Sequence, residues 1–305
     1  MGNQIKTTIL LAVMTIFILW IGQLLGGRQG LIIALIFAVG MNFFSYWYSD
    51  KIVLRMYKAR EATPAQAPEI YSIVQNLARN AGLPTPKVYI IPQSSPNAFA
   101  TGRNPEHAVV AVTEGLLDIM NREELAGVLA HELAHVKNRD ILIGSIAATM
   151  AGAVMMLATM ARWSAIFGGM GDEDEGVGGF GLIVMSILAP IAAVLIQTAI
   201  SRSREYMADA SGARFAGNNE GLALALEKLG AYSAKRPMNA NPSTAHMFIV
   251  TPLSGQKMMR LFSTHPPLED RIARLRGTQT PDKTSGYGGG MDPDKGRAFW
   301  DRLSG

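Results

Sequence analysis

The sequence contains no cysteine in its 305 residues. This absence excludes a disulfide framework, a cysteine nucleophile and any metal site built from thiolates. A zinc ion bound to this chain would need histidine and carboxylate ligands, which are typical of catalytic rather than structural zinc sites. Histidine is also scarce, with five residues, so a pair at metal-binding spacing is a stronger signal here than in a histidine-rich chain.

Charge is sparse as well. Lys, Arg, Asp and Glu make up 17% of the chain, and the net charge of +4 requires no nucleic-acid partner. Four segments contain no charged residue at all: Thr7–Gly27, Gln29–Ser49, Ile141–Ala161 and Gly176–Ser201. Each reaches the roughly 20 residues that a membrane-spanning helix requires. We therefore expect four transmembrane helices, arranged as two helical hairpins in contact with membrane lipid.

The charges that flank these segments predict their orientation. Four basic residues follow the second segment within positions 51–60, and Arg202 and Arg204 follow the fourth, whereas the loop between the third and fourth is acidic at Asp172–Glu175. The positive-inside rule then places both termini in the cytoplasm. The alternative for the third and fourth segments is a pair of buried helices in a soluble domain, but their uncharged length favours the membrane.

The stretch Glu123–Val136 carries the strongest chemical signal. We expect an amphipathic helix, with Asn121 as its N-cap and the Glu124 side chain reaching back to the cap. His131 and His135 lie four residues apart and project from one face, as two imidazoles must to bind one zinc ion. Glu132 is placed to act as a general base. The alternative is a chance pair of histidines on a surface helix.

A catalytic zinc site needs a third protein ligand. Glu205 and Asp209 lie four apart, directly after the fourth apolar segment, and can supply one carboxylate ligand and one carboxylate that orients an imidazole. Taken alone, they are better explained as a solvated acidic pair neutralised by Arg202 and Arg204. An antiparallel hairpin of the third and fourth segments favours the zinc site, because it brings Glu205 close to the two histidines.

The stretch between the first hairpin and the zinc helix is predicted to be water-soluble. We expect a helix over Pro68–Ala81 that ends at Gly82, and strands over Lys87–Ile91 and His107–Val112. With 97–101 between them, these strands form a small sheet. Its edge is a candidate for pairing with an extended substrate, and an ordinary hairpin strand is an equal alternative. The candidate substrate-binding residues are Asn97, Ala98, Phe99 and Ala100. His107 is expected to be a solvated strand residue.

Four stretches, in this order, resemble the HtpX-type membrane metalloproteases. They are N-A-F-A-T-G at Asn97–Gly102, H-E-L-A-H at His131–His135, S-R-S-R-E-Y-M-A-D at Ser201–Asp209 and T-H-P-P-L-E-D-R-I at Thr264–Ile272. These proteases are relatives of the type I CAAX-prenyl proteases and of a mitochondrial stress-activated inner-membrane peptidase. The resemblance implies a gluzincin peptidase of the bacterial cell inner membrane, active on the cytoplasmic side in a stress-related quality-control role towards damaged membrane proteins.

The resemblance also implies roles for individual residues. It makes Glu205 the third ligand of one zinc ion per chain, and Asp209 the partner that orients His131. His265 is held between Thr264 and two prolines before a predicted helix, where it is a candidate donor to the oxyanion of the tetrahedral intermediate. A purely structural role for His265 is an equal alternative.

The predicted fold class is α+β and mainly α-helical, a gluzincin-like peptidase domain with a small β-sheet and four transmembrane helices. The predicted parts are 1–50, a transmembrane hairpin; 51–140, the first part of the peptidase domain; 141–201, a second transmembrane hairpin; 202–276, the rest of the peptidase domain; and 277–305, a flexible tail.

Two other functions compete with a surface-facing peptidase. The first is a site-2-type protease that cuts within the bilayer, which would need its histidine motif inside an apolar span. Charged residues bracket the motif on both sides, at 122–124 and 137–140, which places the zinc at or just outside the membrane surface. The second is a catalytically silent membrane scaffold that keeps the motif, although no member of the catalytic set is missing. The oligomeric state is left open.

Overall fold

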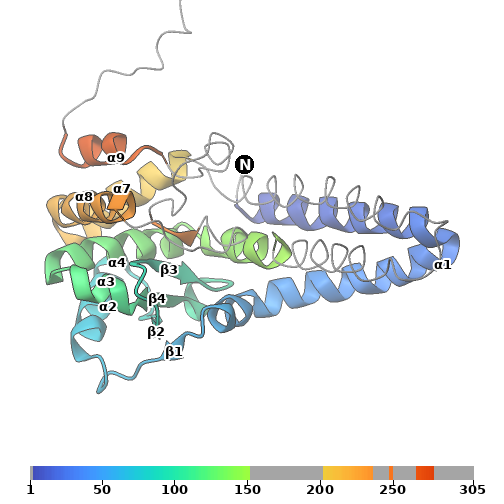
Figure 1. The fold of residues 1–305 in the computed structure, drawn as a ribbon, viewed down its shortest axis with the longest axis horizontal. Helices are drawn as coiled ribbons and strands as arrows, with labels where there is room; N and C mark the ends of the chain where they lie inside the picture. The colour runs from blue at the N-terminus through green and yellow to red at the C-terminus, as the bar shows by residue number, and fades with distance from the viewer. Residues whose placement is uncertain (1–2, 152–201, 236–246, 250–265, 278–305) are drawn as a thin grey trace, which may run out of the picture.

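The computed structural model describes residues 3–151, 202–235, 247–249 and 266–277 (Figure 1). Several predictions fall outside these ranges. They concern the fourth apolar segment, the acidic loop before it, His265 and the tail after 277. Within the described residues the chain is mainly helical with one small sheet, as the α+β prediction requires.

The helix α1 (Asn3–Met56) doubles back at Gly27, whose φ of 54° lies in the left-handed region that suits glycine. Its two halves lie side by side, and Asn42 Nδ2 donates a 2.7 Å hydrogen bond to Thr15 Oγ1 across them (Figure 1). Many of its large apolar side chains face outward; Ile36, for example, is 69% exposed.

One segment in the described part of the chain, Gly27–Met56, is long and apolar enough to cross a membrane. Thr7–Trp20 and Ile141–Ala151 are shorter apolar helices. The prediction of four transmembrane helices is therefore supported for the second segment alone. The third is described only as far as Ala151.

The sheet has four strands in the order β1-β2-β4-β3, with β2 and β4 parallel and the other pairs antiparallel. The strands are β1 (Arg60–Glu61), β2 (Lys87–Ile91), β3 (Ala98–Thr101) and β4 (Val109–Thr113). The prediction placed β2 correctly and began β4 too early. His107 ends a short 3₁₀ helix, η1 (Pro105–His107), because Pro105 starts that turn and the Asn104 side chain accepts a bond from the His107 amide. His107 is exposed, as expected, but it is not a strand residue.

Two helices follow the sequence prediction closely. The helix α2 (Pro68–Ala81) ends at Gly82, whose φ of 64° gives the left-handed cap. The helix α4 (Arg122–Lys137) begins with both bonds of the capping box between Asn121 and Glu124. Among the described residues, further helices are α3 (Glu114–Ile119), the apolar helix Ile141–Ala151, α7 (Arg202–Ala216), α8 (Glu220–Lys235) and α9 (Leu268–Leu275).

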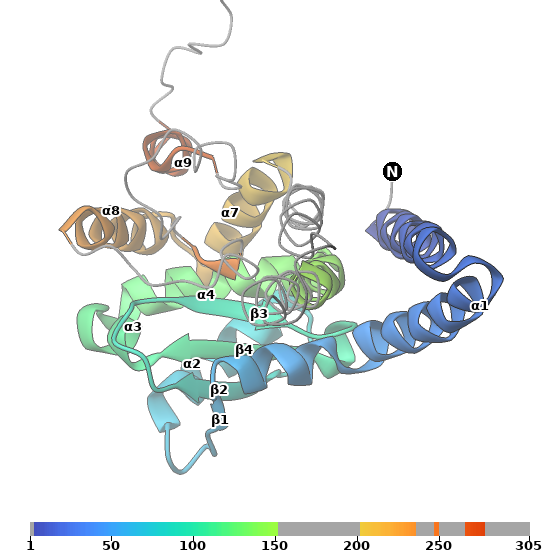
Figure 2. The same cartoon turned by 45° about the vertical axis from the view of Figure 1, so that its right-hand side comes forward.

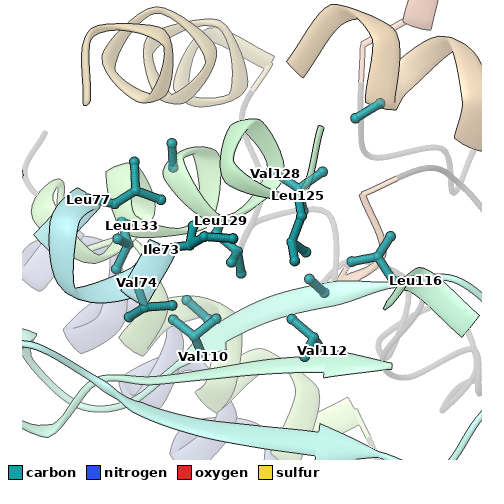
Figure 3. Close-up of a cluster of buried hydrophobic side chains, with 14 of the residues drawn as sticks. Ile73, Val74, Leu77, Val110, Val112, Leu116, Leu125, Val128, Leu129 and Leu133 are labelled. Atoms are coloured by element: carbon teal, nitrogen blue, oxygen red, sulfur yellow. The ribbon is translucent and has the colours of Figure 1, made fainter. Parts of the chain in front are cut away.

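The helix α4 lies at the centre of the part that the sheet, α2, α7 and α8 form. The sheet and α2 pack against it in one apolar cluster (Figure 3), and α7 and α8 lie on its other side (Figure 2). Between Glu124 and Val136, only Ala126 and His135 are not fully buried. The expectation of an amphipathic helix is therefore wrong, because α4 is enclosed on nearly all sides. The end of α1 covers the opposite face of the sheet, where Tyr57 packs against Phe99.

Glycines allow the helices to approach α4 closely. A Cβ atom at Gly212 of α7 would lie 2.8 Å from the backbone nitrogen of His131. A Cβ atom at Gly127 of α4 would lie 2.4 Å from the backbone nitrogen of Leu222 in α8. Such distances are shorter than real side chains tolerate, so the backbones of α4, α7 and α8 touch directly. This close crossing brings the carboxylates of α7 to the histidines of α4.

Candidate metal centre

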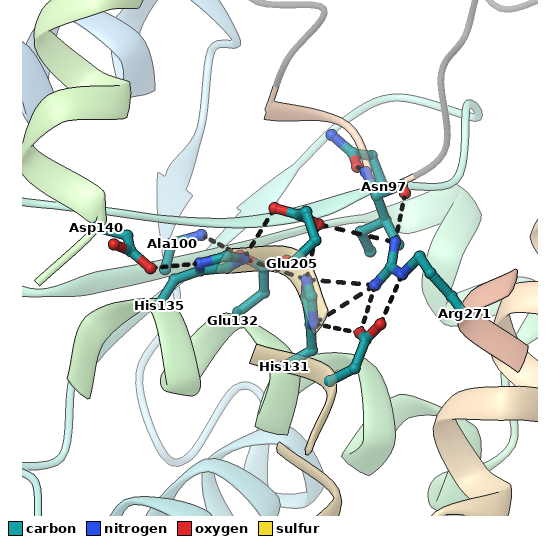
Figure 4. A network of polar contacts seen from close by, with 10 residues as sticks. Asn97, Ala100, His131, Glu132, His135, Asp140, Glu205 and Arg271 are labelled. Carbon is teal, nitrogen blue, oxygen red and sulfur yellow. Dashed lines mark hydrogen bonds and ion pairs between the residues drawn. The ribbon is translucent and has the colours of Figure 1, made fainter. Parts of the chain in front are cut away.

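Three side chains from two helices converge on one point, as Figure 4 shows. His131 and His135 come from α4, Glu205 comes from α7, and their ligand atoms all lie within 4.8 Å of one another. The two Nε2 atoms are 3.2 Å apart. Glu205 places Oε1 at 3.5 Å from His135 Nε2 and Oε2 at 3.7 Å from His131 Nε2. Two nitrogen ligands at 2.0–2.1 Å from a tetrahedral zinc ion are about 3.3 Å apart, so this spacing suits zinc.

Each histidine has a carboxylate at its other ring nitrogen. His131 Nδ1 lies 2.9 Å from Asp209 Oδ1, and His135 Nδ1 lies 3.1 Å from Asp140 Oδ2. A carboxylate accepts the Nδ1 proton and leaves the Nε2 lone pair exposed to the centre. Two lone pairs and a carboxylate that face one another require a cation between them. The donor set therefore fits the zinc ion that the sequence predicts.

Arg271 of α9 is a part of the site that the sequence interpretation missed. It is fully buried, and it donates hydrogen bonds to Asp209 at 2.9 Å from Nε and 2.6 Å from Nη2. Its Nη1 donates to the Ile249 carbonyl at 3.3 Å. Burial alone would raise the pKa of Asp209, but the charge of Arg271 and the hydrogen bonds from His131 and Arg271 lower it to about 2. Asp209 is thus held as a carboxylate.

Asp140 and Arg204 were also missed. Asp140 was read from the sequence as one of the charged residues beside the motif, and Arg204 as a flanking basic residue. Both are buried, and Arg204 Nη1 lies 3.5 Å from Asp140 Oδ1. Their closeness in sequence to the proposed ligands could have indicated a role at the site. Asp140 follows His135 by five residues, and Arg204 directly precedes Glu205.

The carboxylates around His135 raise its pKa by more than burial lowers it. Burial lowers the pKa of His135, whereas the hydrogen bond to Asp140 and the charges of Glu205 and Glu132 raise it, to about 9 overall. Without a metal, a proton on His135 therefore satisfies part of the negative charge. Zinc and proton compete for the same nitrogen, so metal binding releases a proton.

The edge strand β3 reaches the site through its backbone. Ala100 N–H donates a 2.9 Å hydrogen bond to Glu132 Oε2, and Glu132 is 7% exposed (Figure 4). Glu132 is therefore held beside the two histidines, on the side that faces β3.

The other candidate substrate-binding residues have different surroundings. The Asn97 side chain donates from Nδ2 to the Met247 carbonyl at 3.4 Å, and its Oδ1 accepts from the backbone N–H of Ile249 at 3.2 Å. Phe99 is 2% exposed and packs against Tyr57 on the face of the sheet opposite α4. Ala98 and Ala100 belong to the cluster on the α4 face. The structure thus brings Ala100 to the metal centre, whereas the side chains of Asn97 and Phe99 make other contacts.

Comparison with known proteins shows which proteins this chain is similar to. Residues 64–279 match the model of Peptidase family M48. A protein described as a protease HtpX homolog from Desulfatibacillum aliphaticivorans is 67% identical over 99% of this chain and all of its own length. Another, from Desulforapulum autotrophicum, is 65% identical over 99% of this chain and all of its own length. The crystal structure of S. mikatae Ste24p matches with a TM-score of 0.49 and 17% identity, over 90% of this chain and 65% of that one.

Proposed function

The chain belongs to peptidase family M48 and is a metalloprotease, and on this premise we propose that it is a zinc-dependent membrane endopeptidase. His131, His135 and Glu205 would hold one zinc ion per chain. The observation that carries this proposal is the convergence of the Glu205 carboxylate with both imidazoles within 4.8 Å. The orienting carboxylates Asp209 and Asp140 support it, because each leaves an Nε2 lone pair directed at the same point.

Glu132 is the proposed general base. When bound, zinc would act as a Lewis acid that lowers the pKa of water towards neutrality and polarises the scissile carbonyl. Glu132 accepts a proton from the attacking water and delivers it to the leaving amine. The Ala100 N–H fixes one carboxylate oxygen of Glu132, which leaves the other for the water proton. His265, outside the described residues, stays the candidate donor to the oxyanion.

The proposed substrate is a polypeptide in extended form beside β3. Thr113 N donates to Asn97 O at 2.9 Å, so Asn97, Phe99 and Thr101 direct their backbone groups at β4. The backbone groups of Ala98 and Ala100 therefore face away from β4, at the sheet edge next to Glu132. An extended chain that pairs with the backbone of Ala98 and with the Ala100 carbonyl would carry its peptide bonds past the metal centre, while the Ala100 N–H stays on Glu132.

We also propose a membrane location for the enzyme. In this proposal residues 1–50 and 141–201 form two lipid-embedded hairpins, residues 51–140 and 202–276 form the peptidase domain, and 277–305 form a flexible tail. The site faces the cytoplasm from a bacterial inner membrane, and damaged membrane proteins are the substrates. The apolar helix Gly27–Met56, with basic residues at its end, supports the membrane anchor.

The structure also bears on the two competing functions. A protease that cuts within the bilayer needs its motif on a lipid-embedded helix, whereas α4 is enclosed by the sheet, α2, α7 and α8. A silent scaffold would share this fold and differ from the proposed enzyme in zinc binding or in peptide cleavage. Casein cleavage and zinc content of the purified protein therefore decide between scaffold and enzyme.

The direct test of this function is the variant Glu132→Gln in full-length, detergent-purified protein. General-base catalysis contributes about 10²- to 10⁴-fold, so casein cleavage should fall by at least about 100-fold. Zinc content should stay at one ion per chain, because Glu132 is not a ligand. Glu123→Gln, on an exposed position of the same helix, should leave cleavage unchanged. Full activity of Glu132→Gln would refute the assigned base.

A further inference from the structure

The end of α4 places Asp140 directly beside His135. Arg139 N donates to the Val136 carbonyl at 3.1 Å, and Asp140 N donates to the His135 carbonyl at 2.9 Å. These two bonds form a Schellman motif, which requires a left-handed residue between helix and exit. Arg139 supplies it with a φ of 58°, a conformation that non-glycine residues rarely adopt. The backbone of Asp140 is therefore bonded to the backbone of a proposed zinc ligand.

The side chain of Asp140 contacts the same histidine. Asp140 Oδ2 lies 3.1 Å from His135 Nδ1, and the second oxygen, Oδ1, lies 3.5 Å from Arg204 Nη1. Asp140 is 8% and Arg204 7% exposed, so both charges are largely withdrawn from water. Asp140 is therefore in contact with both His135 and Arg204 at a position that is largely withdrawn from water.

Arg204 and Asp140 belong to segments that are far apart in sequence. Arg204 is followed directly by Glu205, the third proposed ligand, in α7. Asp140 is followed directly by the apolar helix Ile141–Ala151. The ion pair therefore connects a residue just after the end of α4 to the first turn of α7. These two positions border residues 141–201 in the sequence. The other histidine has a similar arrangement: His131 contacts the carboxylate of Asp209, and Asp209 contacts Arg271, as His135 contacts Asp140 and Asp140 contacts Arg204.

We propose that Asp140 and Arg204 are positioning residues for the metal centre. Asp140 holds the His135 ring with Nε2 towards the ion, and Arg204 holds the Asp140 side chain in place. This inference rests on the zinc site of the proposed function. It adds that the site depends on contact between the two chain segments that border residues 141–201.

The test is a double-mutant cycle on zinc affinity in full-length, detergent-purified protein. Zinc affinity is measured by competition with a chelator of known affinity for the wild type, Asp140→Ala, Arg204→Met and the double variant. The visible absorption spectrum of the cobalt-substituted protein reports ligand geometry as a second readout. Matched controls are Asp118→Ala and Arg214→Met, which change exposed residues of the same types. The cycle is repeated with Arg204→Lys, which keeps the buried charge, so the test does not depend on the methionine variant folding.

Asp140→Ala should weaken zinc binding by about 10- to 100-fold and shift the cobalt spectrum. Either change at Arg204 should weaken binding in the wild type and add nothing in the Asp140→Ala background, because Arg204 acts through Asp140. Wild-type affinity in Asp140→Ala, or effects that multiply in the double variant, would overturn the inference. A wild-type protein that binds no zinc would instead refute the proposed function itself, so the two failures are distinguishable.

Discussion

Arg271 donates two hydrogen bonds to Asp209, and Asp209 in turn lies 2.9 Å from His131 Nδ1. This relationship connects three helices, because Arg271 lies in α9, Asp209 in α7 and His131 in α4. The helix α9 thus contributes to the metal centre without supplying a ligand. Arg271 also donates to the Ile249 carbonyl, so the same side chain attaches the segment 247–249.

Loss of Arg271 should destabilise the fold strongly. Arg271→Met leaves the buried Asp209 carboxylate without its cation, and breaking a buried pair in this way costs about 3–5 kcal/mol. Arg274→Met is the matched control, since Arg274 lies in the same helix and is exposed beside Tyr206. Chemical denaturation of the detergent-purified proteins gives the unfolding midpoints of the Arg271→Met and Arg274→Met variants. Equal unfolding midpoints for the two variants would contradict this account of Arg271.

The crossing of α7 over α4 should tolerate no side chain at Gly212. A Cβ atom there would lie 2.8 Å from His131 N, so Gly212→Ala must push α7 away from α4 and carry Glu205 with it. We expect weaker zinc binding by chelator competition. Gly230→Ala is the control, because its Cβ atom would meet only the flexible end of Leu268, at 2.9 Å. Unchanged zinc affinity in Gly212→Ala would show that α7 adjusts without moving Glu205.

The capping box should stabilise the histidine helix measurably. Asn121 accepts from the Glu124 amide at 2.9 Å, and Glu124 accepts from the Asn121 amide at 2.8 Å. Asn121→Ala removes the first bond and should lower the free energy of unfolding by about 0.5–2 kcal/mol. Asn121→Asp, which keeps an acceptor, should remain near the wild type. Thermal unfolding compares the three proteins, and no difference between Ala and Asp would argue against the cap.

Local signals explain what the sequence predicted well. The Gly82 stop and the capping box depend on a few adjacent residues, so the bounds of α2 and the start of α4 could be read directly. The approach of Glu205 to the two histidines followed from chain topology together with the resemblance. These signals act within one element or between two elements that a hairpin joins.

The remaining features depend on contacts that no short pattern reveals. Arg271 and Asp209 are 62 positions apart, and nothing in either segment marks them as partners. The strand β1 has two residues and exists through its pairing with β2. The enclosure of α4 depends on glycines that let α7 and α8 approach it closely, which its own apolar pattern does not reveal.

The most direct test of the account is the zinc content of three purified proteins: wild type, Glu132→Gln and Glu205→Ala. Glu205 is 74 positions from His131 in the sequence, yet its Oε2 lies 3.7 Å from His131 Nε2, close enough for both atoms to bind one ion. We predict one zinc ion per chain in the wild type and in Glu132→Gln, and a large loss of zinc in Glu205→Ala, measured by elemental analysis after dialysis against a weak chelator. Full zinc content in Glu205→Ala would contradict the proposal that α4 and α7 share one ion.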